Sequence, residues 1–440
     1  MQDVDSRPNL ILADYLVDAA RDISFEHNIP LAMHWPQMPT NMLHAPYIPG
    51  APGLQVGVLS SEYATLWQRF CGAASIYPAL PALFHYVQWR KKMRMEANVS
   101  RDLPMLRKPD YLCLVNQMIG IETPKDLPPN VAAVGPIVPD QPGCLPELYT
   151  TFLEKKSRVL YIAFGTHLTV PWPTFEKLLR GALAALDSGV IDGIIWPMIS
   201  TTRSDHSATL TVRSPQSKGD QTMSFSELLA GGHPSLLFVD FAPQLALLHD
   251  SRIVAYLSHV GASSMNEALC VGVPIITMGI GFDQLQNVMR VRDAGVSIAL
   301  SKDNFTPDDL ETAIRDIVED KRVHGPISVN VRRMRQIARI CARRKHLAAD
   351  LVEEVLMDAE GRRCEEEAKS RGVEGRTYFK GRKTASPSAD SRCADAYVEV
   401  SELGHVGSLC GVGFDSFWVN IWNHVEICAM KMAMLLFQDS

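Results

Sequence analysis

Residues 258–274 read SHVGASSMNEALCVGVP, a polar cluster that leads into a helical stretch and ends in Gly-Val-Pro. The apolar run IVAYL (253–257) precedes this stretch, and the run VPIIT (273–277) follows it. Both runs have the length and composition of buried strands. The polar cluster therefore lies on a turn between a strand and a helix. Turns of this kind hold anions and nucleotides in α/β proteins.

Short apolar runs alternate with helical segments throughout the second half of the chain. The predicted strands are 159–165, 193–198, 235–241, 253–259, 273–279 and 296–300. The helical segment 173–189 has Pro at its start and Gly at its end, which is the usual asymmetry of a helix. A long amphipathic helical region, roughly 329–358, ends this half. The alternation predicts a parallel sheet with helices on both faces.

The first half shows the same alternation less completely. Strands are predicted at 8–14, 29–33 and 111–116. Helical periodicity is present at 15–24 and from about 62 to 94. Residues 124–143 contain six prolines and few core-forming side chains, which is typical of an interdomain linker. The predicted divisions are an incomplete N-terminal domain at 1–123, a linker at 124–150, a second domain at 151–358 and a tail at 359–440.

The tail differs in composition from the rest of the chain. Residues 360–395 are charged and poor in large apolar side chains, which predicts a disordered linker. The end, FDSFWVNIWNHVEICAMKMAMLLF (414–437), spaces apolar residues at near-helical intervals, but polar and charged residues interrupt it. Two interpretations stay open: an amphipathic helix that contacts a membrane surface or a partner subunit, and a stray C-terminal segment.

The composition is that of an ordinary globular protein. The chain has 440 residues, is 46% hydrophobic and 21% charged, and carries a formal net charge of -6, which gives no electrostatic footprint for nucleic acid. Nine cysteines are scattered without a CxxC pair, which favours reduced thiols over disulfides or a zinc site. The first residues lack the apolar core of a signal peptide, and no uninterrupted apolar run is long enough to cross a bilayer. We expect a cytoplasmic protein, with membrane association only through the tail.

Residues 241–284 carry five motifs in order: aromatic-Ala-Pro-Gln, His-x-Gly, Ser-x-x-Glu, Gly-Val-Pro and Asp-Gln. This stretch closely resembles the donor-binding signature of the UDP-dependent glycosyltransferases of the two-Rossmann (GT-B) type, plant and fungal members in particular. Weaker resemblance extends over roughly residues 8–358. It implies two Rossmann-like domains with parallel sheets, a UDP-sugar as substrate, and no metal or other cofactor.

The resemblance assigns the nucleotide end of the donor to the first motifs. It places uracil on the Phe241 ring, where plant relatives usually have Trp, and stacking on an aromatic ring contributes about 1–3 kcal/mol. Ala242 and Gln244 would read the uracil edge. Glu267 would accept hydrogen bonds from the ribose hydroxyls, although Ser264-x-x-Glu267 has the spacing of a helix capping box as well.

The diphosphate and the sugar would be held by the remaining motifs. His259, Ser263 and Ser264 can donate to phosphate oxygens, and Gly261 lets the backbone approach closely. The resemblance assigns the sugar hydroxyls to the last motif and the β-phosphate to a residue near an earlier strand end. These positions are Asp283, Gln284 and Thr166. The final Gln is associated with glucose as the donor sugar, and a turn-forming role for the Thr stays open.

The catalytic base of the family has no counterpart in this sequence. Family members use a His in the first strand-helix unit, oriented by an Asp farther along, and Asp14 stands at the place of that Asp. By this register, roughly the first hundred residues of a family N-domain are absent. The histidines that remain in this half are His27, His34, His44 and His85. For each of them a structural role at the surface or in the core is favoured over a catalytic role. An incomplete gene model and a bipartite enzyme both fit this pattern.

We therefore expect an inverting glycosyltransferase that moves a sugar, with UDP-glucose as the expected donor, to a hydroxyl of a small lipophilic acceptor. The alternative is a nucleotide-sugar-binding protein or subunit without catalysis, because the region of the catalytic His is missing. A decayed scaffold is the outcome if UDP does not bind.

Overall fold

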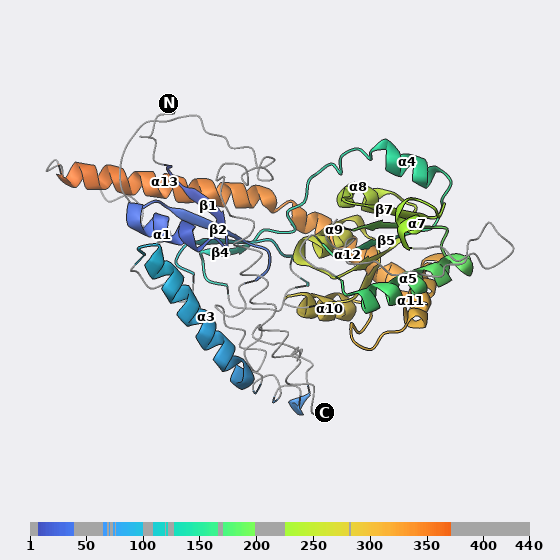
Figure 1. Ribbon diagram of the computed structural model, residues 1–440. Helices are drawn as coiled ribbons and strands as arrows, with labels where there is room; N and C mark the ends of the chain where they lie inside the picture. Colours follow the sequence, from blue (N-terminus) through green and yellow to red (C-terminus); the bar gives the residue numbers. More distant parts are fainter. Residues whose placement is uncertain are drawn as a thin grey trace.

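The structure is a computed structural model. It describes residues 8–38, 65–67, 70, 74, 76–99, 109–118, 120–121, 127–165, 170–198, 225–280 and 283–370. These residues form two sheets whose paired strands are all parallel: a four-stranded sheet in the order β1-β2-β3-β4 and a six-stranded sheet in the order β10-β9-β8-β5-β6-β7 (Figure 1). The two parallel sheets confirm the predicted α/β fold with two Rossmann-like halves.

The four-stranded sheet is built from short strands, of which β2 and β3 in its centre are the most buried. Its strands are β1 (Ile11–Asp14), β2 (Leu31–Trp35), β3 (Leu112–Val115) and β4 (Val131–Ala133). Side chains alternate along β2, so that Leu31 and Met33 face one layer and Ala32 faces the other. The first layer is α1 (Asp18–His27), and the second is α13 (Lys345–Ser370).

The six-stranded sheet forms the larger core. Its strands are β5 (Val159–Ala163), β6 (Gly193–Pro197), β7 (Leu236–Val239), β8 (Ile253–Ser258), β9 (Ile275–Thr277) and β10 (Ser297–Ala299). Every strand predicted in this half is present. The helices α5 (Trp172–Asp187), α7 (Phe225–Leu229) and α11 (Pro307–Val323) cover one face. The other face is covered by α4 (Glu147–Glu154), α8 (Gln244–His249) and α9 (Ala262–Val271).

The strand order reverses between β5 and β8. The chain runs outward from β5 to β7 on one side, then returns to β8 and runs outward to β10 on the other side. The helix after β5 covers one face and the helix after β8 covers the opposite face. Open α/β sheets bind their ligands outside the carboxyl ends of the strands at such a reversal. The turn of residues 258–262 therefore lies at the place where this fold binds a ligand.

Two predicted boundaries differ from the structure. The segment expected as a linker contains β4, because Asn130 donates from Nδ2 to the carbonyls of Pro109 and Tyr111 (2.7 and 2.8 Å) and lays the chain beside β3. The single helical region expected at 329–358 is two helices, α12 (Pro326–Ala342) and α13. The second of these packs on the first sheet and continues to Ser370, so the start of the expected disordered linker is helical.

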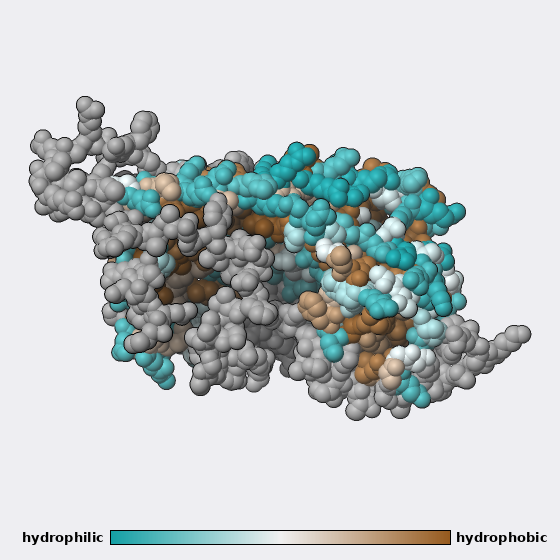
Figure 2. Space-filling view, turned by 90° about the horizontal axis from the view of Figure 1, so that it is seen from above, coloured by the Kyte–Doolittle hydropathy of each residue, from teal (hydrophilic) through white to brown (hydrophobic). Residues whose placement is uncertain are grey.

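The outer surface along α13 is largely hydrophilic in the view from above (Figure 2). Asp350, Glu353 and Glu354 are exposed there, whereas Leu351 and Val355 are buried against the first sheet. Within the described ranges, each helix is too short or too polar to cross a lipid bilayer. The amphipathic helix expected at 414–437 lies outside the described residues.

Helix α3 (Ile76–Glu96) is fixed to α1 by paired charges. Arg94 donates from its two Nη atoms to the two oxygens of Asp22 (2.6 and 2.7 Å). Arg90 donates from Nε and Nη2 to one oxygen of Asp18, Oδ2 (2.9 and 2.6 Å). The spacing of four residues on both helices places the two pairs one turn apart. The Arg94–Asp22 pair is the more buried, with side chains that are 9% and 14% exposed.

We expect the substitution Arg94→Met to lower the free energy of unfolding by about 3 kcal/mol, because it leaves the buried Asp22 carboxylate without its partner. Urea denaturation measures this change. Lys92→Met is the matched control, since Lys92 and Glu96 form an exposed pair at 3.8 Å on the same helix and exposed pairs contribute about 1 kcal/mol or less. Equal effects of the two substitutions would contradict the assigned anchoring role.

Candidate active site

The turn after β8 begins with a residue in an unusual conformation. Val260 has a φ of 61°, which lies in the left-handed region that β-branched residues rarely adopt. Its N–H donates to Oγ of Ser258 at 3.0 Å, and its carbonyl accepts from Nδ2 of Asn287 at 2.9 Å. Its side chain is fully buried beside Met265 and Met118. These contacts hold the chain reversal that places Gly261 at the N-cap of α9.

The imidazole of His259 fills the space between two strand ends. A Cβ at Gly165, just after β5, would lie 3.1 Å from the ring, and a Cβ at Gly261 would lie 2.7 Å from Nε2. A side chain at Gly261 would therefore require the ring to shift, and one at Gly165 would crowd it. Gly165 also has a φ of +76°, which favours glycine independently. His259 and Gly261, both predicted to contact the diphosphate, thus lie side by side.

The N-terminus of α9 excludes one interpretation left open by the sequence. A capping box needs Ser264 at the N-cap, but the N-cap is Gly261 and no side chain caps the helix. Ser264 is instead the third residue of the helix, and Ser263 beside it is exposed. The first turn of α9 therefore carries two hydroxyl groups beside backbone amides that a helix leaves unpaired.

Glu267 faces the interior, where it meets Gln244. Nε2 of Gln244 donates to Oε2 of Glu267 at 2.8 Å and lies 3.3 Å from Oγ of Ser264. The hydroxyl of Tyr256 donates to Oε1 of the same glutamine at 2.8 Å. Burial raises the pKa of Glu267, and the hydrogen bond from Gln244 partly opposes this rise. Two motifs that are distant in sequence, at 241–244 and at 264–267, thus form one hydrogen-bonded group.

Phe241 presents an aromatic ring to solvent at the end of β7. The side chain is 74% exposed, although Ala242 next to it is buried. The hydroxyl of Tyr149, from α4, donates to the carbonyl of Phe241 at 2.6 Å and fixes the backbone there. An exposed ring on a fixed backbone is suited to stacking on a base. Sequence reasoning missed Tyr149, because a single hydroxyl on a separate helix leaves no spacing pattern.

The Asp-Gln pair lies at the start of α10 (Gln284–Asp293). Oδ2 of Asp283 accepts from Nδ2 of Asn287 at 2.9 Å, and the Ala262 amide at the start of α9 donates to the same carboxylate. Burial raises the pKa of Asp283, while these hydrogen bonds act in the opposite direction. Oε1 of Gln284 accepts from the Ile280 amide at 3.0 Å, so this side chain also closes its own turn. Thr166 lies outside the described residues.

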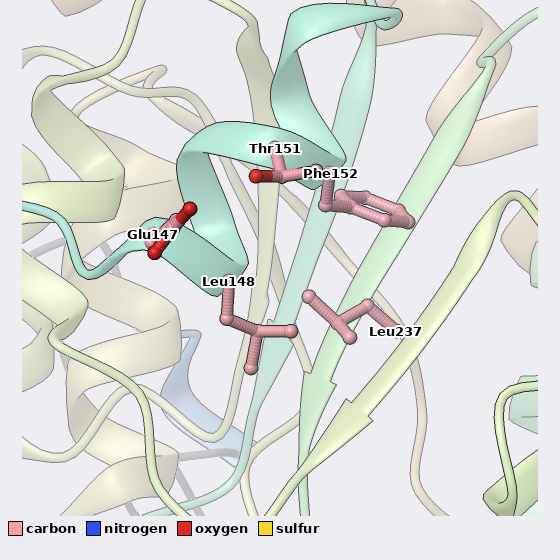
Figure 3. Close-up of a pocket in the computed structure, with 5 residues that line it drawn as sticks. All are labelled: Glu147, Leu148, Thr151, Phe152 and Leu237. Atoms are coloured by element: carbon pink, nitrogen blue, oxygen red, sulfur yellow. The ribbon is translucent and has the colours of Figure 1, made fainter.

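The pocket of Figure 3 lies apart from this group of residues. It is an open hollow of about 500 Å³ between α4 and the edge strand β7. Its lining residues are Glu147, Leu148, Thr151, Phe152 and Leu237 (Figure 3). A second hollow of about 480 Å³ continues from it to Phe241. The first hollow is lined by one ionisable side chain and by none of the motif residues. Its volume therefore does not make it the candidate active site.

Residues 100–330 of the chain match the family model described as UDP-glucoronosyl and UDP-glucosyl transferase. The chain is 41% identical over 359 residues to a UDP-glycosyltransferase of Talaromyces amestolkiae, an alignment that covers 80% of this chain and 66% of the relative. It is 39% identical over 359 residues to UDP-glycosyltransferase 1 of Phaeomoniella chlamydospora, covering 81% of this chain and 70% of the relative. This chain belongs to the UDP-glycosyltransferase family.

Solved structures agree with this family at the level of the fold. A rice (O. sativa) protein, Os79, solved with UDP, has a TM-score of 0.54 and 17% identity, covering 79% of this chain and 78% of that chain. The glycotransferase of kitacinnamycin has a TM-score of 0.51 and 17% identity, covering 79% and 76%. The GT-B fold is therefore confirmed for this member of the family. The chain spans 66% of the length of the first fungal relative and 64% of that of a Fusarium mangiferae relative.

The first sheet places Asp14 beside a histidine. Asp14 and His34 are paired in register at the carboxyl ends of β1 and β2, and Nδ1 of His34 lies 3.6 Å from Oδ2 of Asp14. Burial raises the pKa of Tyr15 to about 12, with smaller contributions from Asp14 and Asp283. Asp283 of the second half thus lies within electrostatic range of the Tyr15 hydroxyl.

The two halves meet near these strand ends. Nδ2 of Asn266 in α9 donates to the carbonyl of Asn116, which follows β3, at 2.9 Å. Met118 packs in the same core cluster as Val260 and Met265. Among the described residues, no three or more His, Cys, Asp or Glu side chains gather as a metal site would require. The expectation that no metal takes part stays a prediction.

We expect Glu267→Gln to raise the free energy of unfolding at neutral pH. The pKa of Glu267 is higher in the folded state than in the unfolded state. The free energy of unfolding therefore falls as the pH rises from the unfolded-state pKa through the folded-state pKa. The substitution removes that charge and keeps an acceptor for Gln244. Urea denaturation from mildly acidic to neutral pH measures it, with a flatter pH slope expected for the variant.

Glu96→Gln, at an exposed position on α3, is the control for removing one negative charge. A Glu267→Gln variant that is less stable than wild type by the same amount at every pH would contradict the inferred burial cost.

Proposed function

We propose that this chain binds a UDP-sugar and transfers the sugar, with inversion, to a hydroxyl of a small lipophilic acceptor. One observation carries the proposal: the strained His259–Gly261 turn opens α9 at the reversal of strand order, on the sheet edge that also presents Phe241. Family membership and the UDP-bound rice structure of the same fold support it. UDP-glucose is the proposed donor, in line with the family description.

The described residues divide among the parts of the donor. Uracil stacks on the exposed ring of Phe241, with Ala242 and Gln244 at its edge. The ribose replaces Gln244 as the hydrogen-bond partner of Glu267, whose carboxylate has two acceptor oxygens. The diphosphate lies at the first turn of α9, where backbone amides, Ser263, Ser264 and the helix dipole favour negative charge. Asp283 and Gln284 lie beside the sugar.

Transfer needs a proton acceptor and a stabilised leaving group. The acceptor oxygen attacks the anomeric carbon, the bond from that carbon to the β-phosphate oxygen breaks, and UDP leaves with the electron pair. The α9 amides and His259 stabilise the charge that develops on the phosphate. In the family the proton acceptor is a His in the first strand-helix unit, and Asp14 stands at the place of the Asp that orients that His; no His of this sequence is assigned to the role by motif. Of the described imidazoles, that of His34 lies beside Asp14, while His27 and His85 are exposed on α1 and α3.

The acceptor class rests on the family and on one neighbour. The rice protein was also solved with a trichothecene, a structure whose TM-score to this chain is 0.50. A cytoplasmic location, contact of the tail with a membrane surface and a partner subunit stay predictions from the sequence.

We expect His259→Ala to weaken UDP binding by at least about tenfold, because a charge-assisted hydrogen bond to an anion contributes roughly 1.5–3 kcal/mol. Isothermal titration with UDP measures the dissociation constant. His249→Ala is the matched control, since His249 is exposed on α8. Failure of the wild-type chain to bind UDP would overturn the proposed function. UDP binding without any UDP-glucose-dependent product across a broad panel of hydroxyl acceptors would leave a binding protein rather than a transferase.

Phe241→Ala should weaken UDP binding by about tenfold through the loss of base stacking, and Phe241→Trp should strengthen it because the indole offers a larger stacking face. The same titration reports both. Phe84→Ala controls for the removal of an exposed aromatic ring, since Phe84 is 62% exposed on α3. An unchanged dissociation constant for both Phe241 variants would remove this residue from the site.

A further inference from the structure

The side-chain amide of Asn287 makes three hydrogen bonds, two from its nitrogen and one to its oxygen. It is fully buried at the end of the first turn of α10, four residues after Asp283. Its Nδ2 donates to the carbonyl of Val260 and to Oδ2 of Asp283, both at 2.9 Å. Its Oδ1 accepts from Nη1 of Arg290 at 3.3 Å. An amide group has two donor hydrogens, so each hydrogen serves a different partner.

The two partners of the amide nitrogen belong to different parts of the donor site. Val260 lies in the turn that precedes the diphosphate-binding end of α9, and its left-handed backbone persists only because its surroundings hold it. Asp283 is the acid proposed to contact the sugar. A second link joins the same parts, because the Ala262 amide donates to the Asp283 carboxylate. Position and orientation of the turn and of the acid are therefore not independent.

We propose that Asn287 is a positioning residue that couples the diphosphate turn to Asp283, so that recognition of the sugar depends on the geometry of the turn that holds the phosphates. This inference rests on the proposed function. Without the amide, the Val260 carbonyl loses the donor that holds the strained turn, and the Asp283 carboxylate loses the donor that fixes its orientation. Both effects then appear together in one variant.

The test compares the dissociation constants of UDP, UDP-glucose and UDP-glucuronate in wild type, Asn287→Ala, Asp283→Asn and the double variant. We expect Asn287→Ala to weaken UDP by roughly tenfold, since two buried acceptors lose their donor. It should also lower the affinity of the better-bound UDP-sugar relative to UDP. Asp283→Asn should lower that ratio alone, with UDP binding at or above the wild-type affinity, because a negative charge beside the phosphate turn is removed. The double variant should show the same ratio as Asp283→Asn.

Gln286→Ala is the matched control, because Gln286 lies on the same helix turn and contacts Arg290 at 3.2 Å. It should change neither UDP binding nor the ratio. Thermal unfolding of each variant checks that the titrations report folded protein. If Asn287→Ala does not fold, the ratio is read in Val260→Gly/Asn287→Ala, since glycine adopts the left-handed backbone without strain.

A ratio that stays at the wild-type value in Asn287→Ala would overturn the inference, whether or not UDP binding weakens, because a merely structural residue would affect UDP and UDP-sugars by the same factor. Ratios in the double variant that fall by the product of the two single effects would also overturn it. A wild-type chain that binds no UDP would overturn the proposed function and this inference together, and is recognised before any variant is compared.

Discussion

The structure depends on a reversal of strand order in the second sheet. The helices that follow the two adjacent strands at the reversal cover opposite faces of the sheet, which leaves an opening at the carboxyl ends of these strands. In this molecule the strands are β5 and β8, and α5 and α9 cover the two faces. The His259 ring occupies the opening between Gly165 and Gly261. Helix α9 starts at this reversal, and Gln244 reaches it through its hydrogen bond to Glu267.

The features that form the site are unfavourable for stability. Val260 holds a backbone that costs of order 1–3 kcal/mol, and burial raises the pKa of both Glu267 and Asp283. A surrounding core offsets these costs: β5 is buried along its whole length, with alternate side chains in the core layers of the two faces. Local strain and buried carboxyls at one edge of a well-packed sheet are typical of a functional site.

Strand periodicity was enough to predict the second sheet, since short apolar runs between helices have few other structures available. The motif spacing predicted a donor site at the carboxyl end of the strand that leads to His259. The pattern did not predict that α13 returns to the first sheet, because an amphipathic helix shows that one face is buried but not against which sheet. Tyr149 and Asn287 escaped prediction for a related reason: each has a partner, Phe241 or Val260, that only the folded chain brings near.

The most direct test of this account is a structure determined with UDP bound. We expect uracil on the ring of Phe241, the ribose hydroxyls on Glu267 after Gln244 has moved away, and the diphosphate at the amides of the first turn of α9 beside His259. UDP seated instead in the hollow between α4 and β7, or with its phosphates away from that turn, would contradict the central claim that the reversal of strand order is the donor site.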